Sequence, residues 1–460
     1  MYAHRYPVAV VEFLDTKKPH PVQLMGKDLV AWLDTTTNQW NVFEDACPHR
    51  LAPLSEGRIE PDGTLLCAYH AWRFNAKGEC TSIPQARKEK EAELCALPKA
   101  CAIAHPVQEA QGLLWVWGEP GAPGSDAALE AALKAPALIP ELEDASTAGR
   151  SKRLTWSIRD MPYGWDYFLE NVLDPAHVSV SHHGITGNRY TSPSYYDLVT
   201  ERELTAEGGF KQRVKPDKEV ETGGMGAGAV SYHEFKPPSL VHISQEYPDG
   251  GKFVLALYAS PTKPGWVRHI GCQVLVENKD GSLPPGLGFF ALPMPTWLSH
   301  VLASVFLHQD MVFLHHQEKI LAKRGYANAA GASGEYVQHV FTPTPQDKGV
   351  IAFRKWLQFY AGGGVPWAAG APPMPEREMD KTVLFDVYNT HTKNCAVCLE
   401  ALKNLKLLRN GFFAASFASV GLSHGPAAVA AGAALAGAGL LLNKLIGLFY
   451  KYEFEHALND

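Results

Sequence analysis

The chain has 460 residues, of which 46% are hydrophobic and 20% are charged, and its formal net charge is −6. This length allows two or three domains with separate cores. No basic block suggests nucleic-acid binding, and eight cysteines are too few for a disulfide-rich secreted scaffold. The N-terminal stretch MYAHRYPVAVVEF shows no signal or transit character, so we expect it to belong to a folded domain.

Short runs with strand composition dominate residues 5–122. Examples are YPVAVVEF, DLVAWLD, WNVFED, TLLCAYHAWRF and GLLWVW, which are separated by turn residues such as PDG and AKG. This pattern predicts a compact all-β domain over residues 1–122, with a linker over 118–128.

Two short motifs in this region each combine a cysteine and a histidine, Cys47-x-His49 and Cys67-x-x-His70. Two Cys and two His can hold either a structural zinc ion or a Rieske [2Fe–2S] cluster. Zinc fingers usually take both Cys from one knuckle and both His from one helix, whereas here each loop supplies one of each. The spacing therefore predicts a Rieske cluster, with zinc as the alternative. Trp72 is expected to serve core packing.

The following part of the chain mixes helix and strand signals, which predicts an α+β fold. A helical stretch containing Trp165, Phe168, Leu169 and Val172 runs up to Pro175. Strand-like segments follow from about 196 to 278, and a long helix is predicted from about 299 to 324.

The stretch ENVLDPAHVSVSHHG contains a second candidate metal site. Non-haem Fe(II) oxygenases hold iron with two His and one carboxylate and leave positions open for oxygen. We expect His177 and His182 to be the two imidazole ligands, with His183 as a spare candidate. The competing interpretation is a helix start, with Asp174 as N-cap and Pro175 at the first helical position.

The missing carboxylate is expected on the long helix, in SVFLHQDMVFLHHQEKIL. A carboxylate on an apolar helix face is costly unless it is paired or metal-bound. Asp310 is therefore the preferred third ligand, Glu318 is the second choice, and a solvent-facing Asp310 is the alternative. At helical spacing, Asp310 shares one mostly apolar face of the predicted helix with four other residues: Phe306, Phe313, Gln317 and Leu321. Asp174 is a candidate bridge between the imidazole N–H groups of a cluster ligand and an iron ligand.

Taken together, these residues resemble the Rieske non-haem iron oxygenases. Longer stretches, including CPHRLAPLSEGR, SHHGITGNR, DMVFLHHQEKILAK and FTPTPQDKGVIAFRKWL, are similar to the branch that contains pheophorbide a oxygenase and translocon-associated Rieske proteins. The overall similarity is greatest to the pheophorbide a oxygenase group. One departure is YHAW, with Ala71 where the family usually has glycine, and another is the absence of a transit peptide from this chain.

The resemblance implies three regions: a Rieske domain over 1–122, a helix-grip catalytic domain with an antiparallel sheet over 123–390, and a CxxC segment with membrane-anchoring helices over 391–460. It implies a homotrimer in which the cluster of one subunit serves the iron of its neighbour, with His70 meeting Asp174 across the interface.

The implied cofactors are a [2Fe–2S] cluster and mononuclear Fe(II). The implied reaction is ring opening of pheophorbide a with O2 and reduced ferredoxin, at a thylakoid, inner-envelope or cyanobacterial photosynthetic membrane. Oxidation of another tetrapyrrole is one alternative, and a non-catalytic redox sensor in a translocon is another.

The C-terminal region has two further features. Cys395-x-x-Cys398 is interpreted as a redox-active pair, with two ordinary thiols or half of a zinc site as alternatives. Apolar segments at 411–422 and 426–442 predict a membrane anchor, either one tilted span or a hairpin, because a span needs about 20 residues. The alternative is a buried helical hairpin at the trimer interface.

Overall fold

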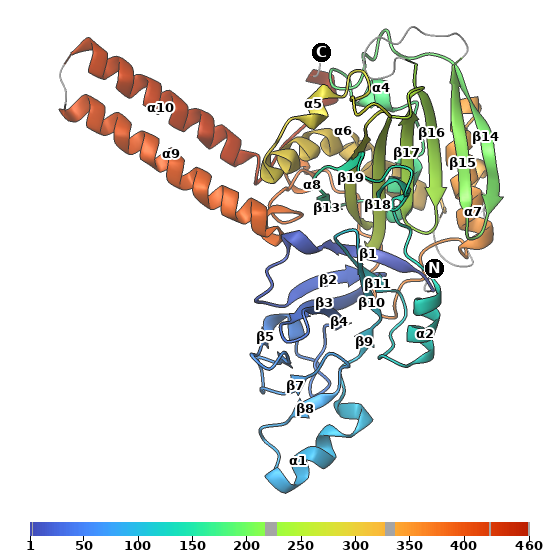
Figure 1. Ribbon diagram of the computed structural model, residues 1–460, viewed down its shortest axis with the longest axis vertical. Coiled ribbons are helices and arrows are strands. Elements are labelled where there is room, and N and C mark those ends of the chain that lie inside the picture. Colours follow the sequence, from blue (N-terminus) through green and yellow to red (C-terminus); the bar gives the residue numbers. More distant parts are fainter. Residues whose placement is uncertain (2, 217–227, 327–335, 423–424, 459–460) are drawn as a thin grey trace. The chain divides into compact units, whose positions relative to one another are not determined.

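The computed structural model describes residues 1, 3–216, 228–326, 336–422 and 425–458. These residues form two units. The first comprises Met1–Leu292 and Leu314–Arg377, and the second comprises Pro293–Phe313 and Glu378–Asp460. Antiparallel sheets and helices are combined in one chain (Figure 1), which confirms the predicted α+β class.

Three small antiparallel sheets make up the N-terminal part of the first unit. One has the order β1–β11–β10, one β2–β3–β4–β9 and one β5–β6–β7–β8. The strands are β1 (Arg5–Val10), β2 (His20–Leu24), β3 (Lys27–Asp34), β4 (Gln39–Glu44), β5 (Arg58–Ile59), β6 (Leu65–Leu66), β7 (Arg73–Phe74), β8 (Cys80–Ser82), β9 (Ala104–His105), β10 (Val107–Ala110) and β11 (Leu113–Trp117). The run TLLCAYHAWRF is thus two short strands, β6 and β7, with a loop between them.

The connection that follows β11 is more ordered than predicted. The expected linker over 118–128 overlaps α2 (Asp126–Leu133), because the Ser125 side chain accepts a hydrogen bond from the amide of Ala128 and caps this helix. A second helix of this part, α1 (Lys88–Cys95), lies between β8 and β9 in the chain.

An eight-stranded antiparallel sheet dominates the remainder of the first unit. Its main path is β12–β19–β18–β17–β16–β15–β14, and β13 also pairs with β19. The strands are β12 (Ser151–Arg153), β13 (Ser157–Met161), β14 (Tyr196–Thr205), β15 (Gly209–Pro216), β16 (Val230–Lys236), β17 (Leu240–Glu246), β18 (Lys252–Lys263) and β19 (Trp266–Val276).

Two helices of the first unit, α3 (Trp165–Val172) and α7 (Lys348–Tyr360), pack against this sheet. The ring of Phe235 on β16 lies 5.2 Å from that of Phe353 and 4.9 Å from that of Trp356, both on α7. Helix α3 ends directly before the segment that carries His177 and His182, so the packing of α3 positions that segment.

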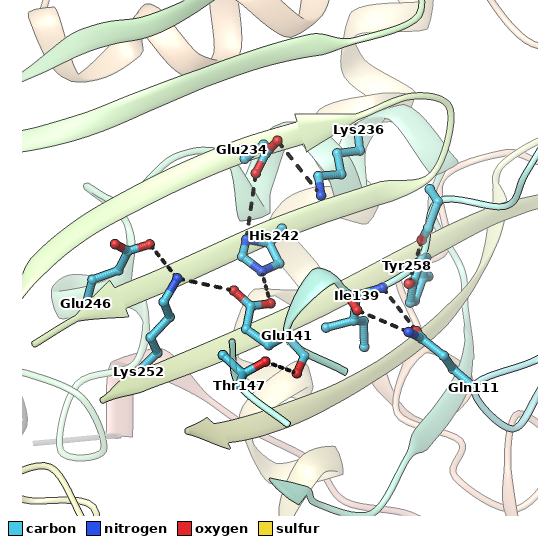
Figure 2. Close-up of polar contacts among 11 residues, drawn as sticks. Gln111, Ile139, Glu141, Thr147, Glu234, Lys236, His242, Glu246, Lys252 and Tyr258 are labelled. Atoms are coloured by element: carbon cyan, nitrogen blue, oxygen red, sulfur yellow. Dashed lines mark hydrogen bonds and ion pairs between the residues drawn. The ribbon is translucent and has the colours of Figure 1, made fainter. Parts of the chain in front are cut away.

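A buried polar network joins the chain after α2 to the sheet (Figure 2). Glu141 Oε2 lies 2.9 Å from His242 Nε2, and Lys252 Nζ lies 3.8 Å from Glu141 Oε1. Burial alone would raise the pKa of Glu141, but the hydrogen bond and charge of His242, with Lys252, lower it to about 2. The side chain of Gln111 exchanges two hydrogen bonds with the backbone of Ile139, which ties the β10–β11 turn to the same connection.

The second unit contains the N-terminal part of α6 (Thr296–Lys323) and the two C-terminal helices α9 (Ala396–Leu422) and α10 (Pro426–Gly447). The predicted long helix over 299–324 therefore corresponds to α6. Figure 1 shows α9 and α10 side by side as a hairpin. Three shorter helices are α4 (Val178–Ser181) and α5 (Gly288–Ala291) in the first unit and α8 (Lys381–Leu384) in the second.

Candidate metal centres

The first Cys-His loop is closed by two backbone hydrogen bonds. The amide of Leu51 donates to the carbonyl of Cys47 at 2.8 Å, and the amide of Cys47 donates to the carbonyl of Ala52 at 2.8 Å. Leu51 adopts a left-handed conformation with φ 59°, which turns the chain back after His49.

The second loop repeats this arrangement. The amide of Ala71 donates to the carbonyl of Cys67 at 2.9 Å, and the amide of Cys67 donates to the carbonyl of Trp72 at 2.9 Å. Ala71, which stands where the family usually has glycine, has φ 59°. Glycine adopts this left-handed conformation without strain, whereas alanine does not. The two loops are thus built alike, each presenting one thiol and one imidazole.

The four predicted cluster ligands fit a Rieske cluster. Cys47 and Cys67 are both 1% exposed, and the rings of His49 and His70 lie 4.5 Å apart. His49 Nδ1 is buried and has no hydrogen-bond partner among the described residues, as suits a nitrogen reserved for iron. Trp72 packs against the core as predicted, and it also stacks on the His49 ring at 4.6 Å with an interplanar angle of 6°. This orienting contact has no signal in the sequence.

Exposed groups surround the imidazole side of these loops. Leu51 is 75% exposed and Tyr69 is 60% exposed, and the Tyr69 ring lies 3.9 Å from the ring of His70. Gln85 donates from Nε2 to the carbonyl oxygen of His70 at 2.8 Å, which fixes the second loop. The histidines therefore lie at a surface where an electron can enter or leave, while the thiols are buried.

The two histidines of the second candidate site bracket the single-turn helix α4. His177 is its N-cap and His182 its C-cap, and their rings lie 5.5 Å apart. His177 Nδ1 lies 2.5 Å from the carbonyl oxygen of Asp174 and 3.9 Å from its carboxylate, so this nitrogen donates and Nε2 is left as the ligand atom. Asn171 Nδ2 lies 3.5 Å from His177 Nε2, a neighbour that the sequence analysis missed.

Two alternative roles in this segment, Asp174 as a helix N-cap and His183 as a spare iron ligand, receive less support. The carboxylate of Asp174 accepts from the amide of Ala176 at 2.8 Å in a tight turn, and α4 begins only at Val178. Asp174 is therefore not the N-cap of a helix. His183 Nδ1 accepts a hydrogen bond from the amide of Arg189 at 3.0 Å, so this nitrogen is occupied in the loop that follows.

The predicted carboxylate ligand Asp310 lies on α6, in the second unit, and is 7% exposed. The helix face from which it was selected is not uniformly buried, because Phe313 is 49% exposed and Gln317 is exposed too. Glu318, the second choice, is buried in an ion pair with Lys319. Burial outweighs Lys319 and raises the pKa of Glu318 to about 7.

The C-terminal cysteines Cys395 and Cys398 are both buried in the second unit and are free thiols in this structure. Their assignment as a redox-active pair remains a prediction.

Comparisons with known proteins agree with this arrangement. A family model described as Rieske [2Fe-2S] domain matches residues 4–101, and one described as Pheophorbide a oxygenase matches residues 235–328. The chain is 34% identical to pheophorbide a oxygenase, chloroplastic, of Oryza sativa subsp. japonica, over 99% of this chain and 84% of that protein.

Two further relatives bear different names. Flavonoid 8-hydroxylase 2, chloroplastic, of Ocimum basilicum is 31% identical over 99% of this chain and 86% of its own length. Protochlorophyllide-dependent translocon component 52, chloroplastic, of Arabidopsis thaliana is 31% identical over 88% of this chain and 74% of its own length.

Among solved structures, dicamba monooxygenase bound to 3,6-dichlorosalicylic acid superposes with a TM-score of 0.55 at 18% identity, over 78% of this chain and 98% of that one. This likeness shows the fold. With the near-complete match to the rice protein, it establishes that the chain belongs to the pheophorbide a oxygenase family of Rieske non-haem iron oxygenases.

Proposed function

We propose that the chain oxygenates a chlorophyll-derived tetrapyrrole and opens the macrocycle of pheophorbide a. The observation that carries this proposal is the 34% identity to pheophorbide a oxygenase along 99% of the chain. The family match at residues 235–328 supports it, because this range includes β17 to β19 of the large sheet and the helix that carries Asp310.

His177, His182 and Asp310 hold the mononuclear iron in this proposal. Asp310 is preferred to Glu318 in this proposal, because the Glu318 carboxylate is already paired with Lys319. Two imidazoles and one carboxylate on one side of the ion suit Fe(II) and leave positions for O2. The bound iron supplies O2 activation, and the Rieske cluster supplies an electron to it.

Asp174 acts in this proposal as a positioning residue. Its backbone carbonyl and its carboxylate both face His177 Nδ1, which fixes the ring with Nε2 directed away from them. We further propose that His70 of a neighbouring subunit meets this carboxylate in a homotrimer. The exposed rim of Leu51 and Tyr69 around His70 supports a docking surface there.

Electrons come from outside the chain in this account, because its sequence has no flavin or nicotinamide motif. Reduced ferredoxin is the proposed donor, delivering one electron at a time to the cluster.

The C-terminal hairpin is proposed to attach the enzyme to a membrane. Helix α10 has 22 residues, a mean hydropathy of 1.7 over its most apolar window, and only 17% of that window is buried. At 1.5 Å per residue it extends about 33 Å, enough for a hydrocarbon core of about 30 Å. The apolar part of α9, residues 411–422, extends only about 18 Å, which favours one span by α10.

Contacts within the hairpin agree with helix packing in an apolar medium. Ser416 donates to the carbonyl of Gly432 at 2.7 Å, and Ser419 donates to the carbonyl of Ala428 at 3.0 Å. Small residues at this seam allow the backbones to approach closely. The relatives are chloroplastic proteins, so a thylakoid, inner-envelope or cyanobacterial photosynthetic membrane is the proposed location.

Substitution of the proposed iron ligand separates an oxygenase from a redox sensor. Purified wild type, Asp310→Ala and the control Asp249→Ala, which alters an exposed turn, would be given iron, reduced ferredoxin and O2. Pheophorbide a, protochlorophyllide a and a flavonoid would be offered separately. We expect Asp310→Ala to lose turnover while its Rieske absorption and reducibility match those of Asp249→Ala. Equal behaviour of the two variants would contradict the assignment of Asp310.

The panel also tests a second candidate function, which the two 31% identical relatives favour. Hydroxylation of protochlorophyllide or the flavonoid, with pheophorbide a unchanged, would retain the reaction class and replace the proposed substrate.

A further inference from the structure

Four side chains meet in the second unit, outside both centres described above: three come from residues 391–398, and the fourth, His300, lies 91 residues before His391. His300 lies in the second turn of α6, and His391 immediately precedes the short helix η7 (Thr392–Asn394). Cys395 follows η7, and Cys398 lies in the first turn of α9. Their exposed fractions are 3%, 5%, 1% and 1% in that order, and one ligand atom from each lies within 4.8 Å of all the others.

The spacing of these atoms is that of a metal coordination sphere. His300 Nδ1 lies 3.2 Å from His391 Nε2, and each of these nitrogens lies 3.2 Å from Cys398 Sγ. Cys395 Sγ lies 3.8 Å from His300 Nδ1. Zinc bonds of about 2.0 Å to nitrogen and about 2.3 Å to sulfur at tetrahedral angles give edges of about 3.3 Å for N–N and about 3.5 Å for N–S.

The orientation of the rings supports the same conclusion. The imidazoles of His300 and His391 cross at 87° with their centroids 4.7 Å apart, and His300 Nδ1 and His391 Nε2 both lie beside Cys398 Sγ. We infer that His300, His391, Cys395 and Cys398 bind one structural zinc ion that fastens the start of α9 to α6.

Charge and chemistry select zinc. Two thiolates and two neutral imidazoles around Zn²⁺ form a group of zero net charge, which lowers the cost of burying it. A tetrahedral set of two sulfurs and two nitrogens is typical of zinc. With four protein ligands the sphere is closed, so the ion is structural, whereas catalytic zinc keeps a position for water or substrate. The N-terminus of α9 favours the negative charge of the thiolates.

The ion would anchor the base of the α9–α10 hairpin. Aromatic contacts surround this base: the rings of Trp297 and Phe449 lie 5.9 Å apart, and those of Tyr388 and Tyr450 lie 5.1 Å apart. On α6, His300 precedes Asp310 by ten residues, or about 15 Å of helix. The zinc ion would therefore hold the helix that carries the proposed iron ligand, and it makes the CxxC pair metal ligands in place of a redox-active pair.

Elemental analysis of the full chain tests this inference independently of turnover. Wild type, Cys398→Ser, His300→Gln and the control Cys101→Ser would be purified without added zinc, and zinc and iron would be measured per chain. We expect about one zinc ion per wild-type and Cys101→Ser chain, and more than a tenfold loss in the two ligand variants. The Rieske absorption, which reports on the first unit, should stay unchanged in all four.

A thiol-protection experiment on the wild type covers the case in which ligand variants do not fold. We expect Cys395 and Cys398 to resist alkylation until a strong chelator is added. Cys101 is not one of the four proposed zinc ligands, so the chelator should not change its rate of alkylation. Iron-replete wild type without zinc would overturn the inference. So would zinc retained in Cys398→Ser, or a reversible Cys395–Cys398 disulfide formed without release of metal.

Discussion

Arg354 is the residue whose loss should most destabilise the helix leading to the His177–His182 segment. Arg354 is 4% exposed, and its guanidinium donates from Nη1 to Asp166 and from Nε to Glu170, each at 2.5 Å. Both carboxylates lie on α3, whose other buried residues are three aromatic residues and one leucine. Tyr336 donates a further hydrogen bond to Glu170 at 2.8 Å.

Arg354→Met keeps the apolar stem and removes the charge. Two buried carboxylates are then left without their cation, which should lower the free energy of unfolding by about 3–5 kcal/mol. The matched control is Arg213→Met. Arg213 pairs with Glu201 at 2.6 Å, but these side chains are 33% and 37% exposed, so its loss should cost no more than about 1 kcal/mol.

Urea unfolding followed by tryptophan fluorescence measures both changes, and Trp165 and Trp356, with rings 6.4 Å apart, report on this region. Adding Asp166→Asn and Glu170→Gln to Arg354→Met should recover part of the loss, because the unpaired charges are removed. Equal destabilisation by Arg354→Met and Arg213→Met would refute the reasoning, and so would a triple variant less stable than Arg354→Met.

Two further predictions concern the first unit. Ala71→Gly should stabilise the protein by about 0.5–1 kcal/mol, because the relieved left-handed strain of about 1–2 kcal/mol exceeds the added entropy of the unfolded chain; thermal unfolding measures this, and Ala68→Gly in the same loop should not stabilise. Glu141→Gln should destabilise by up to about 3 kcal/mol near neutral pH, the equivalent of lowering a pKa from 4.5 to about 2. Because the folded-state pKa is depressed, this contribution is complete above about pH 4.5 and is lost as the pH falls towards about 2, so wild type and Glu141→Gln should converge in acid. A gap between these two proteins that is independent of pH would count against the role given to Glu141.

The sequence predicted most reliably what depends on local spacing. Each Cys-His motif sits on one tight loop, so the residues that define it are close together whatever the rest of the chain does. Strand and helix periodicity likewise predicted the bounds of the strand-rich region that contains β14 to β19, and those of α6, within a few residues. The departure from the family's usual glycine at Ala71 falls at a position with positive φ, which the sequence alone does not show.

Features that depend on tertiary contacts were not predictable. His300 and His391 are 91 residues apart in the sequence, and only the packing of α6 against the start of α9 brings His300 to His391 and the two cysteines. The stacking of Trp72 on His49 depends in the same way on the approach of two loops. Phe313 on the apolar face predicted for α6 is half exposed, because helical spacing alone does not show which part of a face a neighbour covers.

The central claim is that this chain opens the macrocycle of pheophorbide a, and isotope labelling tests it most directly. Purified enzyme with both iron centres restored would receive pheophorbide a, reduced ferredoxin and ¹⁸O2, and products would be followed by absorption and mass spectrometry. We expect the red absorption band to bleach and the product to carry oxygen derived from ¹⁸O2, with neither change in Asp310→Ala. Intact, unlabelled pheophorbide a in the presence of a cluster that is reduced and reoxidised would contradict the claim.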